Sequence, residues 1–200
     1  MWNVLTAFVD ESQPHGTGSG EPYIVTATIP FDMDTVGDMQ DDLRRMRPRN
    51  QTKIHWNESV TSFKEELIDY VAGCQVMHWI ILRESVAGEA PERARAKALE
   101  MLIRELAALE LVEWVVAESR GARLDAHDMR VLDQMRSRRE SVGGLKLTHS
   151  LGVEEAMLWM ADVVCGAAGE RHLGTSDRLG RLAHQTQEVS TNASFPSLIR

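Results

Sequence analysis

The feature that most constrains the fold is a pair of apolar segments near the N-terminus, joined by a stretch rich in glycine and proline. Residues 2–9 are predicted to form a buried strand that leads directly into Asp10 and Glu11. Residues 13–22 are typical of a turn or loop, and residues 23–30 are predicted to form the partner strand. The chain is therefore expected to begin with a β-hairpin whose first strand ends in acidic side chains.

The rest of the chain alternates between strand-like and helix-like segments. Buried strands are predicted at residues 75–83 and 111–117, with a short edge strand at residues 145–148. Helices are predicted at residues 35–47, 62–73, 91–109 and 152–169, and after Asp125. This alternation indicates an α/β fold, in which helices cover both faces of a mixed central sheet. Residues 1–170 are expected to form one domain, and residues 171–200 a peripheral helix or C-terminal tail.

Length, charge and cysteine content exclude several classes of protein. The chain of 200 residues suits a single domain, and its net charge of −8 argues against broad, sequence-blind binding of nucleic acid. No apolar run approaches the roughly 18 residues of a membrane span, and the first residues lack the pattern of a signal peptide. Cys74 and Cys165 lie in predicted regular elements and are expected to be reduced. We therefore expect a cytoplasmic protein without a membrane partner.

Three acidic residues end or interrupt apolar elements. Asp10 follows the first strand, Glu118 follows the strand at residues 111–117, and Asp162 interrupts the apolar helix. Mg²⁺ and Mn²⁺ favour carboxylate oxygens, and two such ions about 3.5–4 Å apart can promote phosphodiester cleavage. The pattern therefore predicts a divalent-metal site held by Asp10, Glu118 and Asp162, with Asp125 as a further candidate ligand.

Each of these acids also has a structural interpretation. Asp10 could form a turn, and Glu118 could be a solvated charge at a strand end. Asp162 could pair with an arginine or cap a neighbouring backbone. Asp125, like Asp128, is interpreted first as a helix cap.

Lys53 and His55 are the next candidates for a functional site. They lie two positions apart in a segment predicted to be extended, so their side chains would share one face. A cation and an imidazole beside a metal site can bind phosphate or move protons. The alternative is a surface pair on an edge strand next to Trp56. His149 could reach the same end of the sheet as the acids, whereas His78 is interpreted as a hydrogen-bonded core histidine.

Several motifs resemble those of domain of unknown function 3800, a family of bacterial and phage proteins assigned to the ribonuclease-H-like superfamily. The resemblance spans roughly residues 4–169, and its opening and closing motifs are fairly specific in combination. The matching segments are Phe8-Val9-Asp10-Glu11-Ser12 with the strand at Tyr23, Lys53-Ile54-His55-Trp56, Val116-Ala117-Glu118-Ser119-Arg120 with Asp125 and Asp128, and Leu158-Trp159-Met160-Ala161-Asp162.

The resemblance implies a ribonuclease-H-like fold in which acids on the hairpin, a later strand and a C-terminal helix bind two Mg²⁺ or Mn²⁺ ions. Carried over to this chain, those acids are Asp10, Glu118 and Asp162, with Asp125 or Asp128 as additional candidates. Glu118 stands where an aspartate is common in the superfamily.

The function expected from these features is a metal-dependent nuclease that acts on nucleic acid. Lys53 and His55 would assist at the catalytic site, and Arg120 and Arg123 would hold the scissile strand. One alternative is a catalytically silent ribonuclease-H-like module that binds a protein or nucleic-acid partner. Another is a phosphatase for small nucleotides. A homodimer through an exposed Trp56 and the methionine-rich helices is a further expectation.

Overall fold

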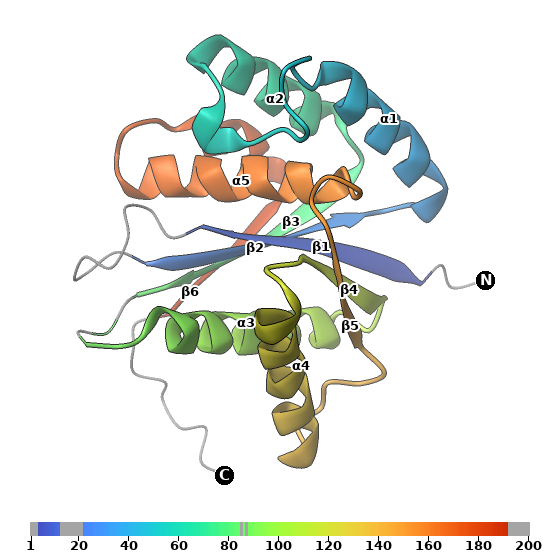
Figure 1. The fold of residues 1–200 in the computed structure, drawn as a ribbon, viewed down its shortest axis with the longest axis vertical. Coiled ribbons are helices and arrows are strands. Elements are labelled where there is room, and N and C mark those ends of the chain that lie inside the picture. The colour runs from blue at the N-terminus through green and yellow to red at the C-terminus, as the bar shows by residue number, and fades with distance from the viewer. Residues whose placement is uncertain (1–3, 13–21, 85, 87, 192–200) are drawn as a thin grey trace.

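Six strands form one mixed sheet in the computed structural model, which describes residues 4–12, 22–84, 86 and 88–191 (Figure 1). The strand order is β5-β4-β1-β2-β3-β6. Antiparallel pairing joins β1 to β2 and β2 to β3, and parallel pairing joins β4 to β1, β5 to β4 and β6 to β3. The strands are β1 (Leu5–Ser12), β2 (Tyr23–Pro30), β3 (Val76–Arg83), β4 (Val112–Glu118), β5 (Lys146–Ser150) and β6 (Thr186–Thr191).

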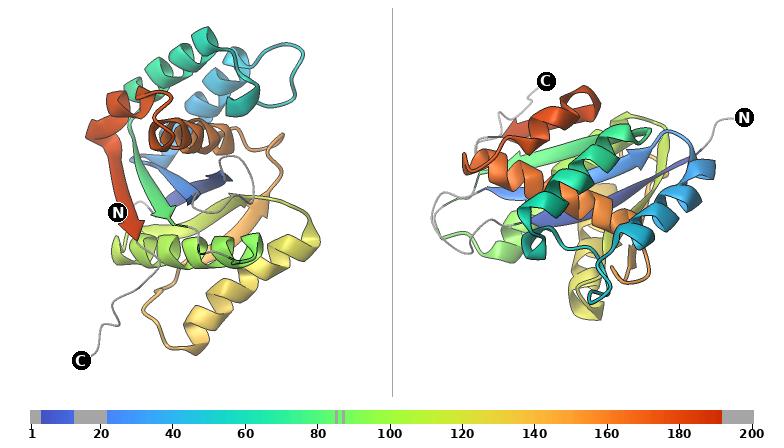
Figure 2. Two further views of the ribbon diagram at one scale, coloured as in Figure 1. Left: turned by 90° about the vertical axis from the view of Figure 1, so that its left-hand side faces the viewer. Right: turned by 90° about the horizontal axis from the view of Figure 1, so that it is seen from above.

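Helices cover both faces of this sheet, as the sequence predicts (Figures 1 and 2). The apolar helix α5 lies on one face, with α1 and α2 outside it, while α3 and α4 lie on the other face. The helices are α1 (Val36–Met46), α2 (Thr61–Gly73), α3 (Pro91–Ala108), α4 (Ala122–Ser137) and α5 (Met157–His172), with 3-10 turns at η1 (Met33–Thr35), η2 (Trp56–Glu58) and η3 (Arg178–Gln185). Because α5 packs against the sheet and against two helices, it is apolar nearly all round.

The alternation of side chains along β1 separates two hydrophobic cores. Ala7 and Val9 pack toward α3 and α4, whereas Phe8 packs toward α5. The sequence predicts that Asp10 ends the first strand. In the structure the strand continues to Ser12, so Asp10 lies within it. The loop predicted at residues 13–22 lies, except for its last residue, outside the described residues.

The C-terminal segment differs from its prediction as a peripheral helix or tail. After α5 the chain makes the 3-10 turn η3, and β6 then pairs with β3. This places β3 between two strands, which agrees with the apolar character of both its faces. Sequence patterning does not predict β6, because this edge strand, Thr186 to Thr191, has a polar composition without an apolar period. No helix in the described part of the chain is long and apolar enough to cross a membrane.

Candidate metal centre

Asp10 and Asp162 meet on the α5 face of the sheet. Asp10 points to this face because its parity along β1 is that of Phe8. Asp162 lies on α5, which packs directly on β1 and β2. The two carboxyl groups lie within hydrogen-bonding reach of each other. Asp10 is 9% exposed and the Asp162 side chain is 17% exposed, so water solvates neither carboxylate freely.

The pKa values of both carboxyl groups are raised. Burial raises the pKa of Asp10 well above its usual value, and the charges of Asp162 and Glu118 add to this, while Lys53 opposes it. Burial also raises the pKa of Asp162, against the hydrogen bond from Trp56. Burial and mutual repulsion therefore disfavour full ionisation of the pair, and a bound cation would offset both effects.

Glu118 and Lys53 form an ion pair beside these two acids. Parallel pairing of Val9 with Ala117 brings the end of β4 alongside Asp10. The Lys53 ammonium donates to Oε1 of Glu118 at 2.5 Å. Burial alone would lower the pKa of Lys53, but Glu118 and the two aspartates outweigh it and raise the pKa. Lys53 thus supplies a fixed positive charge to the acids.

The segment that carries His55 is held against α5 by Trp56. The backbone N–H of Trp56 donates to Oδ2 of Asp162 at 2.7 Å, and its indole N–H donates to Oε1 of Glu170 at 3.2 Å. Between these contacts the indole lies on Gly166, where a Cβ would overlap the ring. The three α5 residues lie one turn apart on one helix face. As a result, Nδ1 of His55 lies 3.8 Å from Oδ2 of Asp162.

This arrangement corrects the interpretation of Trp56 as an exposed residue. Its side chain is 1% exposed and belongs to the core between α2 and α5. Lys53 and His55 lie in a loop before the turn η2 rather than on an edge strand. Trp56 is therefore not available on the surface for the homodimer contact that the sequence suggested.

The oxygen-rich donor set fits the chemistry of a hard divalent cation. Asp10 and Asp162 are already in contact, and Glu118 is close enough to raise the pKa of Asp10. As the side chains lie, no group of three or more His, Cys, Asp or Glu residues in the described ranges has a metal-binding arrangement. Glu118 is instead paired with Lys53. To complete a three-carboxylate site, Glu118 must exchange the ammonium for the cation.

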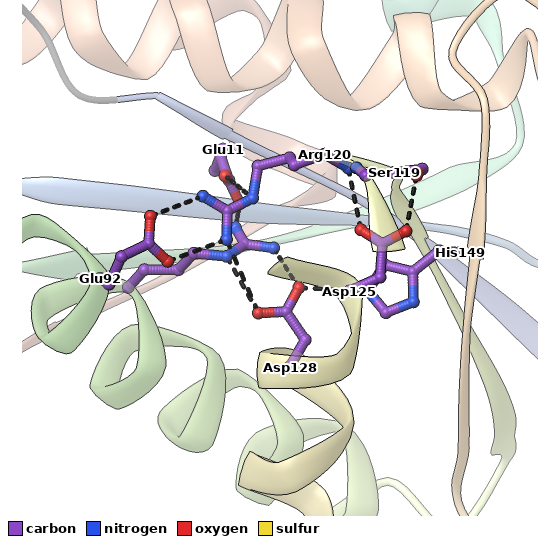
Figure 3. Close-up of polar contacts among 9 residues, drawn as sticks. Glu11, Glu92, Ser119, Arg120, Asp125, Asp128 and His149 are labelled. Carbon is purple, nitrogen blue, oxygen red and sulfur yellow. Dashed lines mark hydrogen bonds and ion pairs between the residues drawn. The ribbon is translucent and has the colours of Figure 1, made fainter. Parts of the chain in front are cut away.

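Asp125 has other partners. It lies in the first turn of α4, where its carboxylate accepts from Ser119 Oγ at 2.6 Å and from the backbone N–H of Arg120 at 2.9 Å (Figure 3). Burial would raise the pKa of Asp125, but these two hydrogen bonds outweigh it and lower the pKa. The helix begins at Ala122 with Gly121 at its N-cap, so Asp125 and Asp128 lie inside α4 and neither is the helix cap that the sequence predicts. Asp125 instead fixes the segment before the helix, and its role as a metal ligand stays a prediction.

A second polar cluster lies on the opposite face, between the sheet and α3 and α4 (Figure 3). Arg95, which is 3% exposed, donates to both oxygens of Asp128 at 3.1 and 2.5 Å and also pairs with Glu11. Nε2 of His149 lies 3.1 Å from Asp128 Oδ2. His149 thus faces α4 and not the proposed metal ligands.

Arg120 belongs to the same cluster. Its guanidinium lies 3.2 Å from Glu11 Oε1 and hydrogen-bonds to both oxygens of Glu92. Arg120 is thus held by acids of this chain, in contrast to its expected role on a substrate strand. The sequence interpretation did not include Arg95, although an arginine on the apolar side of α3, next to Ala94 and near Ala98, is a usable sign of a buried ion pair.

Comparisons with known proteins support the fold. No protein-family model and no curated protein matches the chain. A chain of the PCNA:RNase HII complex from Archaeoglobus fulgidus matches with 14% identity and a TM-score of 0.56, over 85% of this chain and 75% of that one. The ribonuclease H2 from Pyrococcus horikoshii OT3 matches with 11% identity and a TM-score of 0.57, over 85% and 74%.

Bst-RNase HIII in complex with Mn²⁺ matches with 13% identity and a TM-score of 0.54, over 91% of this chain and 56% of that one. At such low identities the likeness shows the fold. The predicted ribonuclease-H-like fold is therefore confirmed, while membership of the domain of unknown function 3800 family stays a prediction.

Proposed function

We propose that this protein is a metal-dependent nuclease in which Asp10, Glu118 and Asp162 hold Mg²⁺ or Mn²⁺. The observation that carries this proposal is the contact between Asp10 and Asp162, two buried carboxyl groups from distant parts of the chain whose pKa values are both raised. A pair of acids in this state gains most from a divalent cation.

The chain's own residues divide the work as follows. Asp10 and Asp162 would be the anionic ligands of the metal. Glu118 would leave Lys53 for the metal, and the Lys53 ammonium would then be free to bind a phosphate oxygen. Nδ1 of His55 is buried and makes no hydrogen bond in the described structure, so it can accept or donate a proton beside Asp162. Divalent ions held there would supply an activated water and would stabilise the leaving oxygen.

The motif resemblance and the fold support a finer assignment. The segments shared with domain of unknown function 3800 supply each of the three acids and the segment that carries Lys53 and His55. The chain, with residues 1–170 as its main domain, is accordingly proposed to be a member of that family.

The second candidate function is a catalytically silent module of the same fold. The observation that favours it is the Lys53–Glu118 ion pair, which neutralises one acid without a metal. In this case the site has a purely structural role, and the protein binds a macromolecular partner elsewhere on its surface.

Metal titration followed by thermal unfolding separates the two candidates. Mn²⁺ is expected to raise the melting temperature of the parent protein, because binding to the folded state alone stabilises it. Asp10→Asn should remove this rise. Asp133→Asn, on the exposed surface of α4, is the matched control and should retain it. A parent protein whose melting temperature does not respond to Mn²⁺ or Mg²⁺ would contradict the metal site.

Cleavage assays then test the substrate. Single-stranded DNA, duplex DNA, RNA, RNA–DNA hybrids and small nucleotides form the panel, with Asp162→Asn as the inactive reference. Phosphate release from small nucleotides without cleavage of any polymer would favour a phosphatase instead.

A further inference from the structure

A strip of the sheet next to the proposed metal centre is not covered by a helix. On this face α5 packs on β1, β2 and β3, which leaves the same face of β4 and β5 partly open. Along β4 this face carries Trp114 and Val116 and ends at Glu118, because Trp114 and Val116 pair with Thr6 and Phe8. In β5, Lys146 and Thr148 lie in register with Trp114 and Val116. We call Trp114, Val116, Lys146 and Thr148 the β4–β5 strip.

The strip presents an aromatic ring and a cation to solvent. Trp114 is 40% exposed, so a large part of its aromatic surface faces solvent. The Lys146 ammonium lies 4.7 Å from the centre of the Trp114 ring and also pairs with Glu113. Thr148 is exposed beside them. Core packing therefore covers only part of Trp114, and the rest of its aromatic surface is available to a ligand.

The strip leads directly to the acids. Trp114 and Glu118 are four positions apart on one strand, which corresponds to about 13 Å. Stacked nucleotides advance by about 3.4 Å each along a strand. A base on Trp114 is therefore no more than about four nucleotides from a phosphate at Asp10 and Glu118. Cations stand at both ends of this path, Lys146 at one end and Lys53 at the other.

We propose that the β4–β5 strip binds a single-stranded segment of nucleic acid next to the scissile phosphate, with Trp114 stacking on a base and Lys146 contacting a phosphate. This inference rests on the proposed nuclease function and adds the substrate class. An exposed ring beside a cation is the arrangement that binds unpaired bases, whereas bases within a duplex are already stacked on each other. Lys146 must exchange Glu113 for the phosphate on binding.

The test measures the binding of labelled octanucleotides of DNA and RNA, with metal chelated so that no cleavage occurs. Trp114→Ala is expected to weaken octanucleotide binding about 5-fold or more, which corresponds to the loss of one stacked base. Trp114→Phe should restore most of the affinity. Lys146→Ala should weaken binding and reduce its dependence on salt by about one phosphate contact.

Phe31→Ala is the matched control, since Phe31 is an aromatic residue that is 51% exposed and lies outside the strip. If Trp114→Ala binds the octanucleotides as tightly as the parent protein, the strip is not the binding surface, while the metal titration still stands. Tighter binding of duplexes than of single strands by the parent would also overturn the inference. A parent that binds neither Mn²⁺ nor any oligonucleotide would contradict the proposed function itself.

Discussion

Asp10 and Glu11 are neighbours in β1, but their carboxylates lie on opposite faces of the sheet. Asp10 contacts Asp162 on the α5 face, and Glu11 contacts Arg95 and Arg120 on the face of α3 and α4. The acid proposed as a metal ligand, Asp10, is thus next in sequence to Glu11, whose charge is already balanced by two arginines. The Glu11 contacts fix the end of β1, so the position of Asp10 depends on ion pairs that a substrate on the α5 face does not touch.

Arg95→Met should destabilise the protein by about 3–5 kcal/mol, because it leaves the fully buried Asp128 without its main partner. Chemical denaturation measures the change. Arg93→Met, two residues earlier on α3 and with a side chain that is 72% exposed, is the control and should cost less than about 1 kcal/mol. If both substitutions lowered the free energy of unfolding equally, burial of the Arg95–Asp128 ion pair would not contribute to its stabilising effect.

Gly166→Ala should cost about 1–3 kcal/mol, since the added methyl overlaps the Trp56 ring in a packed core. The displaced Trp56 also weakens its hydrogen bond to Asp162, so the stabilisation by Mn²⁺ should fall. Gly37→Ala in α1 has open space around it and should leave stability unchanged or slightly increased. Denaturant titration with and without Mn²⁺ measures both effects, and a variant with parental stability would refute the packing argument.

Lys53→Met should strengthen Mn²⁺ binding while lowering nuclease activity. In the parent protein the Lys53 ammonium is hydrogen-bonded to the Glu118 carboxylate. Substitution of Lys53 frees that carboxylate to bind the metal. A hydrogen bond to a charged group contributes about 1.5–3 kcal/mol, so the midpoint of the Mn²⁺ titration should fall about 10-fold. Lys97→Met, which removes a lysine paired with Glu89, should have no effect. Weaker metal binding in Lys53→Met would show that Lys53 and the metal do not compete for Glu118.

The Glu170 carboxylate is expected to make the free energy of unfolding depend on pH in the acidic range. Burial would raise the pKa of Glu170, but hydrogen bonds from Lys64 and Arg178 outweigh it and lower the pKa. Because the folded-state pKa is depressed, the ionised carboxylate stabilises the fold above the unfolded-state value of about 4.3, and this contribution is lost as the pH falls through the folded-state value.

The measurement is the difference in unfolding free energy between the parent protein and Glu170→Gln as a function of pH. The parent should be more stable near neutral pH, and the difference should shrink below about pH 4. Glu66→Gln, an exposed position on α2, controls for the substitution itself. A difference that does not vary with pH would exclude a stabilising role for the Glu170 charge.

The sequence predicts those elements whose burial pattern is strong. The hairpin, the apolar helix and the interior strand β3 are recognisable because each has an apolar pattern of the correct period. His78 is the core histidine that was expected, with hydrogen-bonding contacts to Thr28 and Gln185 and a pKa lowered to about 3 by burial and by His184.

The sequence fails where a residue's environment depends on distant contacts. The burial of Trp56 requires Gly166, which lies more than a hundred positions away. The pairing of Arg95 with Asp128 and Glu11 brings together three elements that local periodicity does not relate. The meeting of Asp10 and Asp162 was anticipated because an acid in an apolar helix is costly without a partner. The Lys53–Glu118 pair was not, because both residues have plausible solvated positions.

The parallel pairing of β6 with β3 has a consequence for synthesis. A ribosome delivers β3 long before residues 186–191, so the outer edge of β3 has exposed peptide groups while most of the chain is already made. Nascent chains in this state can associate through that edge until β6 pairs with it. A short polar segment thereby protects the newly made protein from aggregation.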